Sequence, residues 1–573
     1  MAKWRFFLAF FTAAWLSVPV ASAGGIDPQA TAQRVDELLA GEAFGGAAPA
    51  PADAVAAKEP AEKAAAENVA VAKPVGAHAP AAKADDQTLL RRLTLDLIGQ
   101  APTPAEITAF TLNSAPDKRA AAVERLLASP QFGDNWARYW RDVIMYRRSE
   151  ERALLASGAV VEFLAKEFNG DPHWDQIARK FITATGDVTE EGATAIIMAQ
   201  MANAEDTTAE ISRIFLGIQI QCAQCHNHPT DRWKREQFHE LAAFFPRIAV
   251  RPVRDADKGK RRSFEVVSID RGPKVKKADK PNRGSLEHYM PDLDHPEAEG
   301  KLMKPVFFVT GQKLDTGLTD QERRTLAAEW ITARKDRWFA KAFVNRLWSE
   351  LVGRGFYEPV DDIGPDRACS APHTLDFLAD RFAASQYDVK WLFRVITATE
   401  AYARSSRSRY DESGAPFAAS CPQRLRADQL YNTLATILGL DDDRQGEAKR
   451  ADYRRPFATP RGRVNLAFGY DPSVRRDEVA GSIPQALFLM NGPELNRALS
   501  ARGPNTMLGK LLAEIDKDDA VVEELYLRCL AREPHDEEVE TCLEYVKSIG
   551  NRGEAFEDIA WSLVNSTEFL NRK

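Results

Sequence analysis

The segment from Glu210 to Pro229 reads EISRIFLGIQIQCAQCHNHP and contains Cys222-Ala-Gln-Cys225-His226, a CxxCH motif. With six Cys and nine His in 573 residues, chance produces this spacing in roughly one such chain in a thousand. Thr207 and Glu210 have the spacing of a capping box, so we expect a helix to begin there. Apolar residues then recur at a 3.6-residue period, which predicts one apolar helix face ending in the two thiols.

CxxCH is the spacing at which proteins attach a c-type haem. In that interpretation Cys222 and Cys225 form thioether bonds with one covalent haem, and His226 ligates the haem iron. Helical spacing would place all three side chains within about one turn. Spacing does not single out a sixth iron ligand. The nearby candidates are Met198, Met201, His228 and His239.

Three other interpretations of the motif stay open. Cys222 and Cys225 could form a local disulfide in an oxidising compartment. With His228 and His239 they could form a tetrahedral Zn site, because C-x2-C-x2-H-x10-H is close to accepted ligand spacing. The two cysteines could also be buried small hydrophobic residues. A second helix is predicted after Pro229 by apolar residues at i, i+3, i+4 and i+7, namely Phe238, Leu241, Ala242 and Phe245.

Residues 1–23 have the features of a cleaved signal peptide: a basic start, an apolar run, and Ala21-Ser-Ala23 before the cleavage site. We therefore expect an exported protein, periplasmic or extracellular. No later apolar run is long enough to span a bilayer, so we expect no transmembrane segment after signal cleavage. Residues 24–84 are rich in Ala and Pro and predict a flexible linker, with one short helix at 27–40.

The remaining sequence predicts a mainly α fold: two multi-helical domains, 85–248 and 319–573, with a charged insert at 249–318. Short strands are expected in this insert, at Phe264–Ile269 and Lys304–Val309. Lys449–Gly469 is expected to be an irregular surface loop. The formal net charge of −7 and the pI of about 5.9 argue against nucleic-acid binding, although the insert is locally basic.

Common catalytic motifs such as G-x-S-x-G, the Walker loop and H-E-x-x-H do not occur in the sequence. The adjacent carboxylates Asp361 and Asp362 could bind a cation or act as acid and base, or serve as caps and salt-bridge partners. The sequence does not decide whether the protein is an enzyme. The cysteines outside the motif have no spacing signature and no assigned pairing: Cys369, Cys421, Cys529 and Cys542.

The chain resembles secreted planctomycete-type proteins that pair the domain-of-unknown-function families 1549 and 1553, often joined to cytochrome c-like domains. The segments LLRRLTLDLIGQAPTPAEI, RLLASPQFGDNWARYWRDV and FLGIQIQCAQCHNHPTDRW are typical of the first family. FVNRLWSELVGRGFYEPVDDIGP, RLRADQLYNTL and SIPQALFLMNGP are typical of the second. The resemblance implies export, a cytochrome-associated context, and Cys222, Cys225, His226, His228 and Pro229 as motif positions. This chain departs from the usual family pattern at Asn227 and Thr230.

The sequence therefore favours an exported envelope protein with one c-type haem for electron transfer or redox sensing, which would act with a redox partner or another envelope protein. The alternative is a non-redox scaffold or binding protein whose Cys/His cluster forms a disulfide or a structural Zn site. A third hypothesis, a component of extracellular polymer degradation, rests on the family context alone.

Overall fold

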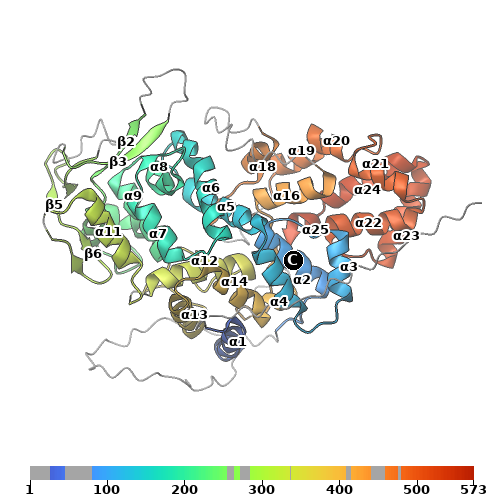
Figure 1. Cartoon of the computed structure of the whole chain (residues 1–573), viewed down its shortest axis with the longest axis horizontal. Coiled ribbons are helices and arrows are strands. Elements are labelled where there is room, and N and C mark those ends of the chain that lie inside the picture. The colour runs from blue at the N-terminus through green and yellow to red at the C-terminus, as the bar shows by residue number, and fades with distance from the viewer. Residues whose placement is uncertain are drawn as a thin grey trace, which may run out of the picture.

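The computed structural model describes residues 26–44, 80–253, 263–271, 284–315, 317–335, 337–407, 415–439, 459–474, 479 and 481–573. In this part the chain is mainly α-helical and its sheets have only two or three strands, which confirms the predicted fold class (Figure 1). The predicted signal peptide and residues 45–79 of the predicted linker lie outside the described residues. None of the described helices is both long enough and apolar enough to cross a membrane.

The helices of the first half begin and end at local signals. Helix α2 follows the N-cap Asp85, whose carboxylate accepts a hydrogen bond from the Thr88 amide, and it ends at Gly99 with φ +71°. Helix α3 opens with the reciprocal Thr103–Glu106 capping box. The helices are α1 (Pro28–Phe44), α2 (Asp86–Ile98), α3 (Pro104–Leu112), α4 (Lys118–Leu127), α5 (Pro130–Met145), α6 (Ser157–Asn169), α7 (Trp174–Thr183), α8 (Ala195–Ala199), α9 (Ala204–Ile211) and α10 (Arg235–Ala242).

Short antiparallel strands occupy the predicted insert. The predicted strand at Phe264–Ile269 is confirmed as β3 (Phe264–Ser268), which lies between β1 (Gly186–Asp187) and β2 (Ile248–Pro252). The predicted strand at Lys304–Val309 is only the two-residue β6 (Val306–Phe307). The other strands of the insert are β4 (His288–Met290), β5 (Lys301–Met303) and β7 (Gln312–Lys313).

Helices again dominate the second half. The predicted loop at Lys449–Gly469 is wrong in its second part, where Thr459 caps a helix with Pro460 at its first position. Residues 483–498 form two helices separated at Gly492. The elements are α11 (Asp320–Ile331), α12 (Trp338–Val352), α13 (Pro372–Ala384), α14 (Val389–Ala398), α15 (Glu400–Ala403), β8 (Gln423–Arg424), α16 (Ala427–Leu438), α18 (Pro460–Phe468), α19 (Ile483–Asn491), α20 (Pro493–Ala498), α21 (Met507–Glu514), α22 (Asp518–Leu530), α23 (Asp536–Ile549), α24 (Arg552–Val564), α25 (Thr567–Leu570) and β9 (Asn571–Arg572).

The hydrophobic cores do not follow the predicted division at 249–318. The largest core runs from Ala32 to Phe417 and so contains residues from both predicted helical domains. At its centre Trp140 of α5 stacks on Phe343 of α12, with ring centroids 5.8 Å apart. A second core consists of residues 425–569 together with Leu95 of α2. The packing therefore changes near residue 420, beyond the insert.

Helix α1 confirms the short helix predicted at 27–40 and extends it to Phe44, and it packs on the folded structure, which corrects the prediction of a flexible linker for this part of residues 24–84. It lies against α13 and α14 (Figure 1). The Glu400 amide N–H is shared between the two carboxylate oxygens of Asp36, each at 3.0 Å, and Trp391 donates its indole N–H to the Ile26 carbonyl at 2.8 Å. Helix α1 thus fastens the N-terminal side of the described chain to the second half.

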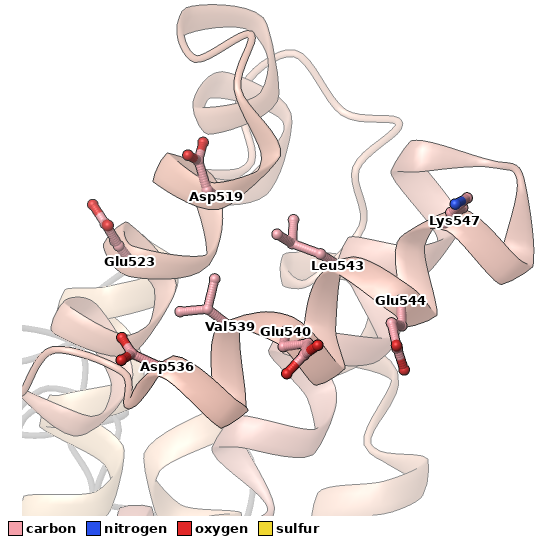
Figure 2. Close-up of a pocket in the computed structure, with 8 residues that line it drawn as sticks. All are labelled: Asp519, Glu523, Asp536, Val539, Glu540, Leu543, Glu544 and Lys547. Atoms are coloured by element: carbon pink, nitrogen blue, oxygen red, sulfur yellow. The ribbon is translucent and has the colours of Figure 1, made fainter.

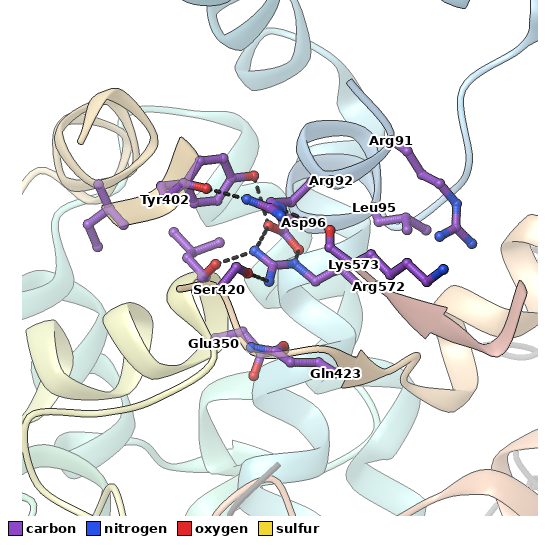
Figure 3. A network of polar contacts seen from close by, with 12 residues as sticks. Arg91, Arg92, Leu95, Asp96, Glu350, Tyr402, Ser420, Gln423, Arg572 and Lys573 are labelled. Carbon is purple, nitrogen blue, oxygen red and sulfur yellow. Dashed lines mark hydrogen bonds and ion pairs between the residues drawn. The ribbon is translucent and has the colours of Figure 1, made fainter. Parts of the chain in front are cut away.

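The C-terminal strand is fastened to the first half by a buried polar network (Figure 3). Arg572 donates from Nε and one terminal nitrogen to the two carboxylate oxygens of Asp96, each at 2.7 Å. Tyr402 donates its hydroxyl to the same carboxylate at 2.8 Å, and Arg92 donates to the Lys573 carbonyl at 2.9 Å. The last two residues of the chain are therefore held against α2, which belongs to the first half.

Candidate functional site

The chain that leads to the CxxCH motif begins as a helix and then turns sharply. Helix α9 starts after Asn203, whose side chain accepts from the Glu205 and Asp206 amides, so the start predicted at Thr207 is wrong by one turn. The helix continues as a π-helical turn, Ser212–Leu216, and stops at Gly217 with φ +69°. The predicted single helix through to Cys225 is therefore wrong as well.

Gly217 lies in close contact with the loop that follows α12. A Cβ atom at this position would lie 2.7 Å from the Cδ1 of Ile363, and the left-handed backbone would be strained for any other residue. The Ile363 amide donates a hydrogen bond to the Gly217 carbonyl at 2.7 Å. The loop that follows α12 therefore fixes where the motif segment leaves its helix.

Beyond Gly217 a short 3-10 turn, Ile220–Gln224, presents the motif at the surface. Ile220 and Ala223 are fully buried, whereas Cys222 and Cys225 are exposed and neither is bonded to another cysteine. The expectation that the thiols end an apolar helix face, or are buried small hydrophobic residues, is wrong. Two buried aliphatic residues hold the turn, and its thiols face outward.

His226 is also exposed, and its ring is oriented by the backbone. Nδ1 lies 2.7 Å from the carbonyl oxygen of Asn227, while the side-chain oxygen of Asn227 accepts from the Arg235 amide at 3.1 Å. A carbonyl oxygen can only accept, so Nδ1 carries the proton and Nε2 of the neutral ring has a free lone pair. Nε2 is therefore the nitrogen available to a metal ion, with Nδ1–H held by a carbonyl as in many metal-ligating histidines.

The loop after the motif folds back on an aromatic anchor. The amide of His228 donates to the Trp233 carbonyl at 2.8 Å, and Nδ1 of His228 accepts from the Thr230 amide at 3.4 Å. Trp233 is buried, with its ring edge-on to Phe308 and Trp338 at centroid distances of 5.1 and 5.8 Å. His228 is half-buried in this loop, beside the motif.

His239 lies beneath the motif on α10 and both of its ring nitrogens are engaged. Nε2 is 3.0 Å from the carbonyl oxygen of Gln224, and Nδ1 is 2.9 Å from Nε2 of His288 on β4. Because the carbonyl can only accept, Nε2–H of His239 is the donor and Nδ1 accepts from His288. Burial lowers the pKa of His239, against the opposing effect of the Gln224 contact. This histidine supports the backbone of the motif.

The four residues of the predicted Zn site are not assembled as ligands in this arrangement. In the part of the chain that the structure describes, no group of three or more His, Cys, Asp or Glu side chains is placed to hold a metal ion. A Zn site with Cys222, Cys225 and His228 would require His239 to give up one of its two hydrogen bonds.

A buried ion network lies behind the motif segment and joins it to the loop after α12. Arg213 pairs with Glu210 at 2.6 Å and with Asp361 at 3.0 Å, and Arg346 pairs with the same Asp361 oxygen at 3.2 Å. Gln219 donates to the other Asp361 oxygen at 2.8 Å. These charged side chains are almost completely removed from solvent.

The electrostatics of Asp361 follow from its partners. Burial alone would raise its pKa, but Arg213 and Arg346 hold the pKa well below its usual range. Asp362, the adjacent carboxylate, instead forms a more exposed pair with Arg367 at 3.0 Å. Asp361 is therefore a structural salt-bridge partner, one of the roles considered from the sequence. Its partner Arg213, in the middle of an apolar run, carried no sequence signal of its own.

Comparison with family models divides the chain at the insert, whereas the core packing changes near residue 420. Residues 75–250 match the family described as PSCyt2, protein of unknown function (DUF1549), and residues 322–546 match PSD1, protein of unknown function (DUF1553). The chain pairs these two families. No curated protein and no solved structure matches it.

The motif belongs to the PSCyt2 region, residues 75–250, and Asp361 belongs to the PSD1 region, residues 322–546. The Arg213–Asp361 pair and the Ile363–Gly217 hydrogen bond therefore join the two family regions directly behind the exposed cysteines. The segment that presents Cys222, Cys225 and His226 is shaped by both regions.

The chemistry of the motif residues fits covalent attachment of a haem. Both thiols are free and accessible, and the Nε2 lone pair of His226 is available. Of the four candidate sixth ligands, Met198 and Met201 lie in the large core and His239 is hydrogen-bonded at both nitrogens, which leaves the half-buried His228.

The pocket shown in Figure 2 is not part of this site. It has a volume of about 520 Å³, lies between α22 and α23, and is lined by five carboxylates, two aliphatic residues and Lys547. None of the motif residues lines it. The candidate site is thus an exposed segment of the PSCyt2 region rather than this acidic pocket.

Proposed function

We propose that the protein is an exported c-type haem protein, with one haem held by Cys222, Cys225 and His226, and that it transfers electrons or senses redox state. The observation that carries the proposal is the outward presentation of all three groups from a turn whose Ile220 and Ala223 are buried. When bound, the haem would supply one-electron redox chemistry. A redox partner in the envelope would exchange the electron.

The protein's own residues have distinct tasks in this proposal. The two thiols would hold the group covalently, and the Asn227 carbonyl would keep the Nε2 atom of His226 directed outward. His239 supports the Gln224 carbonyl between the two cysteines, and Arg213 with Asp361 holds the preceding turn. These contacts fix the motif while leaving its outer side accessible to an attachment apparatus and to a partner.

The predicted leader of residues 1–23 supports the same proposal from the sequence, because covalent haem attachment of the bacterial kind takes place after export. The family description PSCyt2 is consistent with a cytochrome link and assigns no activity.

The test is expression of the full chain with its leader in a host that matures a control c-type cytochrome. We expect the purified protein to gain the mass of one haem and to keep its Soret band after acid-acetone extraction, which removes non-covalent haem. Cys222→Ser combined with Cys225→Ser should remove both signals. Cys542→Ser, a half-buried cysteine outside the motif, should keep them. A colourless wild-type protein of unmodified mass would refute the proposal.

The alternative of a disulfide has one observation in its favour, since Cys222 and Cys225 are exposed free thiols three residues apart. It predicts a scaffold or binding protein without a haem. In the experiment above, a colourless chain lighter by two hydrogens per molecule would select the disulfide, and stoichiometric Zn would select the metal site.

A further inference from the structure

The main-chain carbonyl of Gln224, between the two cysteines of the motif, accepts hydrogen bonds from two side chains of α10. His239 donates from Nε2 at 3.0 Å, and Arg235 donates from Nε at 3.3 Å. A carbonyl shares its rigid peptide plane with the next amide, which here is the amide of Cys225. The two donors therefore orient the peptide group that leads into the second thiol.

Both donors are held in turn by residues of the insert. Nε2 of His288 on β4 lies 2.9 Å from Nδ1 of His239, and it donates there because Nε2 of His239 carries the proton of that ring. A terminal nitrogen of Arg235 donates to the carbonyl of Pro291, directly after β4, at 2.5 Å. Helix α10 thus lies between the motif and the insert, and each of its two donors bridges them.

The segment that supplies these contacts, residues 284–303, is firmly placed on the fold. A Cβ atom at Gly284 would lie 2.4 Å from the carbonyl oxygen of Ile248, so only glycine allows this close approach. Arg247 donates from Nε to the Leu286 carbonyl at 2.8 Å. Strand β4 is further paired with β5, which runs antiparallel to it. The segment is therefore a fixed support for α10.

The support comes from outside both family regions. The motif and the part of α10 that bears Arg235 and His239 lie within residues 75–250, whereas His288 and Pro291 lie between that region and residues 322–546. His288 is 5% exposed and His239 is 1% exposed, so their contact is shielded from water. The insert thus reaches the motif through a buried contact that neither family model covers.

We propose that His288 and Arg235 are positioning residues of the CxxCH motif, and that the insert segment 284–303 acts through them to hold the turn between Cys222 and Cys225 in one conformation. Two thioether bonds to one porphyrin require the thiols at a fixed separation, and a motif held in advance meets that requirement at a lower entropy cost. This role rests on the proposed function, because the turn that is held is the site of haem attachment.

The test is amide hydrogen exchange of residues 220–226 in the mature full chain, measured by mass spectrometry at one pH. His288→Phe removes the donor to His239 and should make this exchange about 5-fold faster, the effect of one ordinary hydrogen bond. His288→Gln keeps an N–H donor and should exchange like the wild type. Rescue by this conservative variant separates a positioning role from simple filling of space.

Arg235→Lys is a second variant on a partly exposed side chain, and it decides the matter if His288→Phe does not fold. It keeps the charge, but a single ammonium group does not reproduce the fork that bridges two carbonyls. Exchange of residues 220–226 should become at least about 2-fold faster. Helix α24, in the second core, is the internal reference and should exchange at the wild-type rate in every variant.

The matched control is His295→Phe, because His295 belongs to the same segment and its side chain is 76% exposed. This variant should leave the exchange of residues 220–226 unchanged. The proposal is overturned if His288→Phe and Arg235→Lys both exchange like the wild type, if His288→Gln does not restore the slow rate, or if His295→Phe has the same effect. Equal acceleration in α24 would also overturn it, since the change would then be a general loss of stability.

These outcomes are separate from those of the haem test. A wild-type chain without haem would refute the proposed function, while the exchange rates would still decide whether the insert holds the turn. A wild-type chain that carries haem, with exchange unaffected by His288→Phe and Arg235→Lys, would refute the positioning role alone.

Discussion

The segment that carries the motif, residues 210–226, buries charged side chains on its inner side and exposes cysteines on its outer side. This is the reverse of the usual distribution of these residue types. On the inner side Glu210 and Arg213, residue types that proteins rarely bury, are almost completely enclosed, and Arg213 is paired with both Glu210 and Asp361. On the outer side Cys222 and Cys225 are exposed, although free cysteine is among the most buried residue types. The two sides therefore have different roles. The inner side stabilises the fold, and the outer side is accessible for chemistry. Substitutions on the two sides should therefore have different consequences.

The largest effect is expected from Arg213→Met. The change removes the partner shared by Glu210 and Asp361 and leaves both carboxylates buried. Breaking a buried ion pair from one side typically costs about 3–5 kcal/mol, so the free energy of unfolding should fall by that amount. Chemical denaturation followed by circular dichroism measures it.

Arg34→Met is the matched control for this change, because Arg34 forms a partly exposed pair with Glu37 on α1. Exposed pairs contribute about 0–1 kcal/mol. If Arg213→Met were as mild as Arg34→Met, the inner side would not maintain the fold as the contacts indicate.

The adjacent carboxylates offer a sharper comparison with a smaller expected effect. Asp361→Asn keeps the shape and one acceptor but removes the charge between Arg213 and Arg346, and should cost about 2–3 kcal/mol. Asp362→Asn affects only the more exposed Arg367 pair and should cost less than about 1 kcal/mol. Unfolding curves of the two variants, recorded under the same conditions, measure the difference. Equal costs would contradict the account.

Asp361 also determines how the stability of the protein should change with pH. The pKa of Asp361 is lowered in the folded state, so its contribution is present above the unfolded pKa of about 3.9 and is lost as the pH falls through the folded pKa. The stability difference between the wild type and Asp361→Asn should therefore be constant near neutral pH and shrink in acid. A difference that grows in acid would refute this assignment.

The smallest effect is expected from His239, which lies beneath the motif and supports its backbone. The pKa of His239 is lowered in the folded state. The contribution of His239 to the stability of the fold is therefore complete above about pH 6.5 and is lost as the pH falls below that value. Amide exchange at residues 220–226 should become faster between about pH 7.5 and about pH 5.5, after correction for the intrinsic rate. In His239→Gln this pH dependence should disappear. A pH dependence that persists in the variant would show that another group controls the turn.

Local features of the fold could be predicted from the sequence because their causes are local. The short helix at 27–40 and the strand β3 were both predicted, and each depends on residues within a few positions. Helix α18 was missed although its signal, Thr459 followed by Pro460, was present in the sequence. An Arg- and Pro-rich composition obscured it.

What the sequence did not predict depends on contacts between distant residues. The close contact of Gly217 with Ile363 joins residues 146 positions apart in the chain. The helical halves share a core because Trp140 stacks on Phe343 across the insert. The motif residues themselves were found from spacing alone, whereas their exposure, and the engagement of His239 with Gln224, required the tertiary structure.

The pyridine haemochrome spectrum of the exported, purified wild-type protein tests the central claim most directly, because it identifies haem held by thioether bonds and measures its amount. The account predicts the spectrum of a c-type haem at one haem per chain. A folded chain without a haemochrome signal, produced beside a control cytochrome that matures normally, would contradict it.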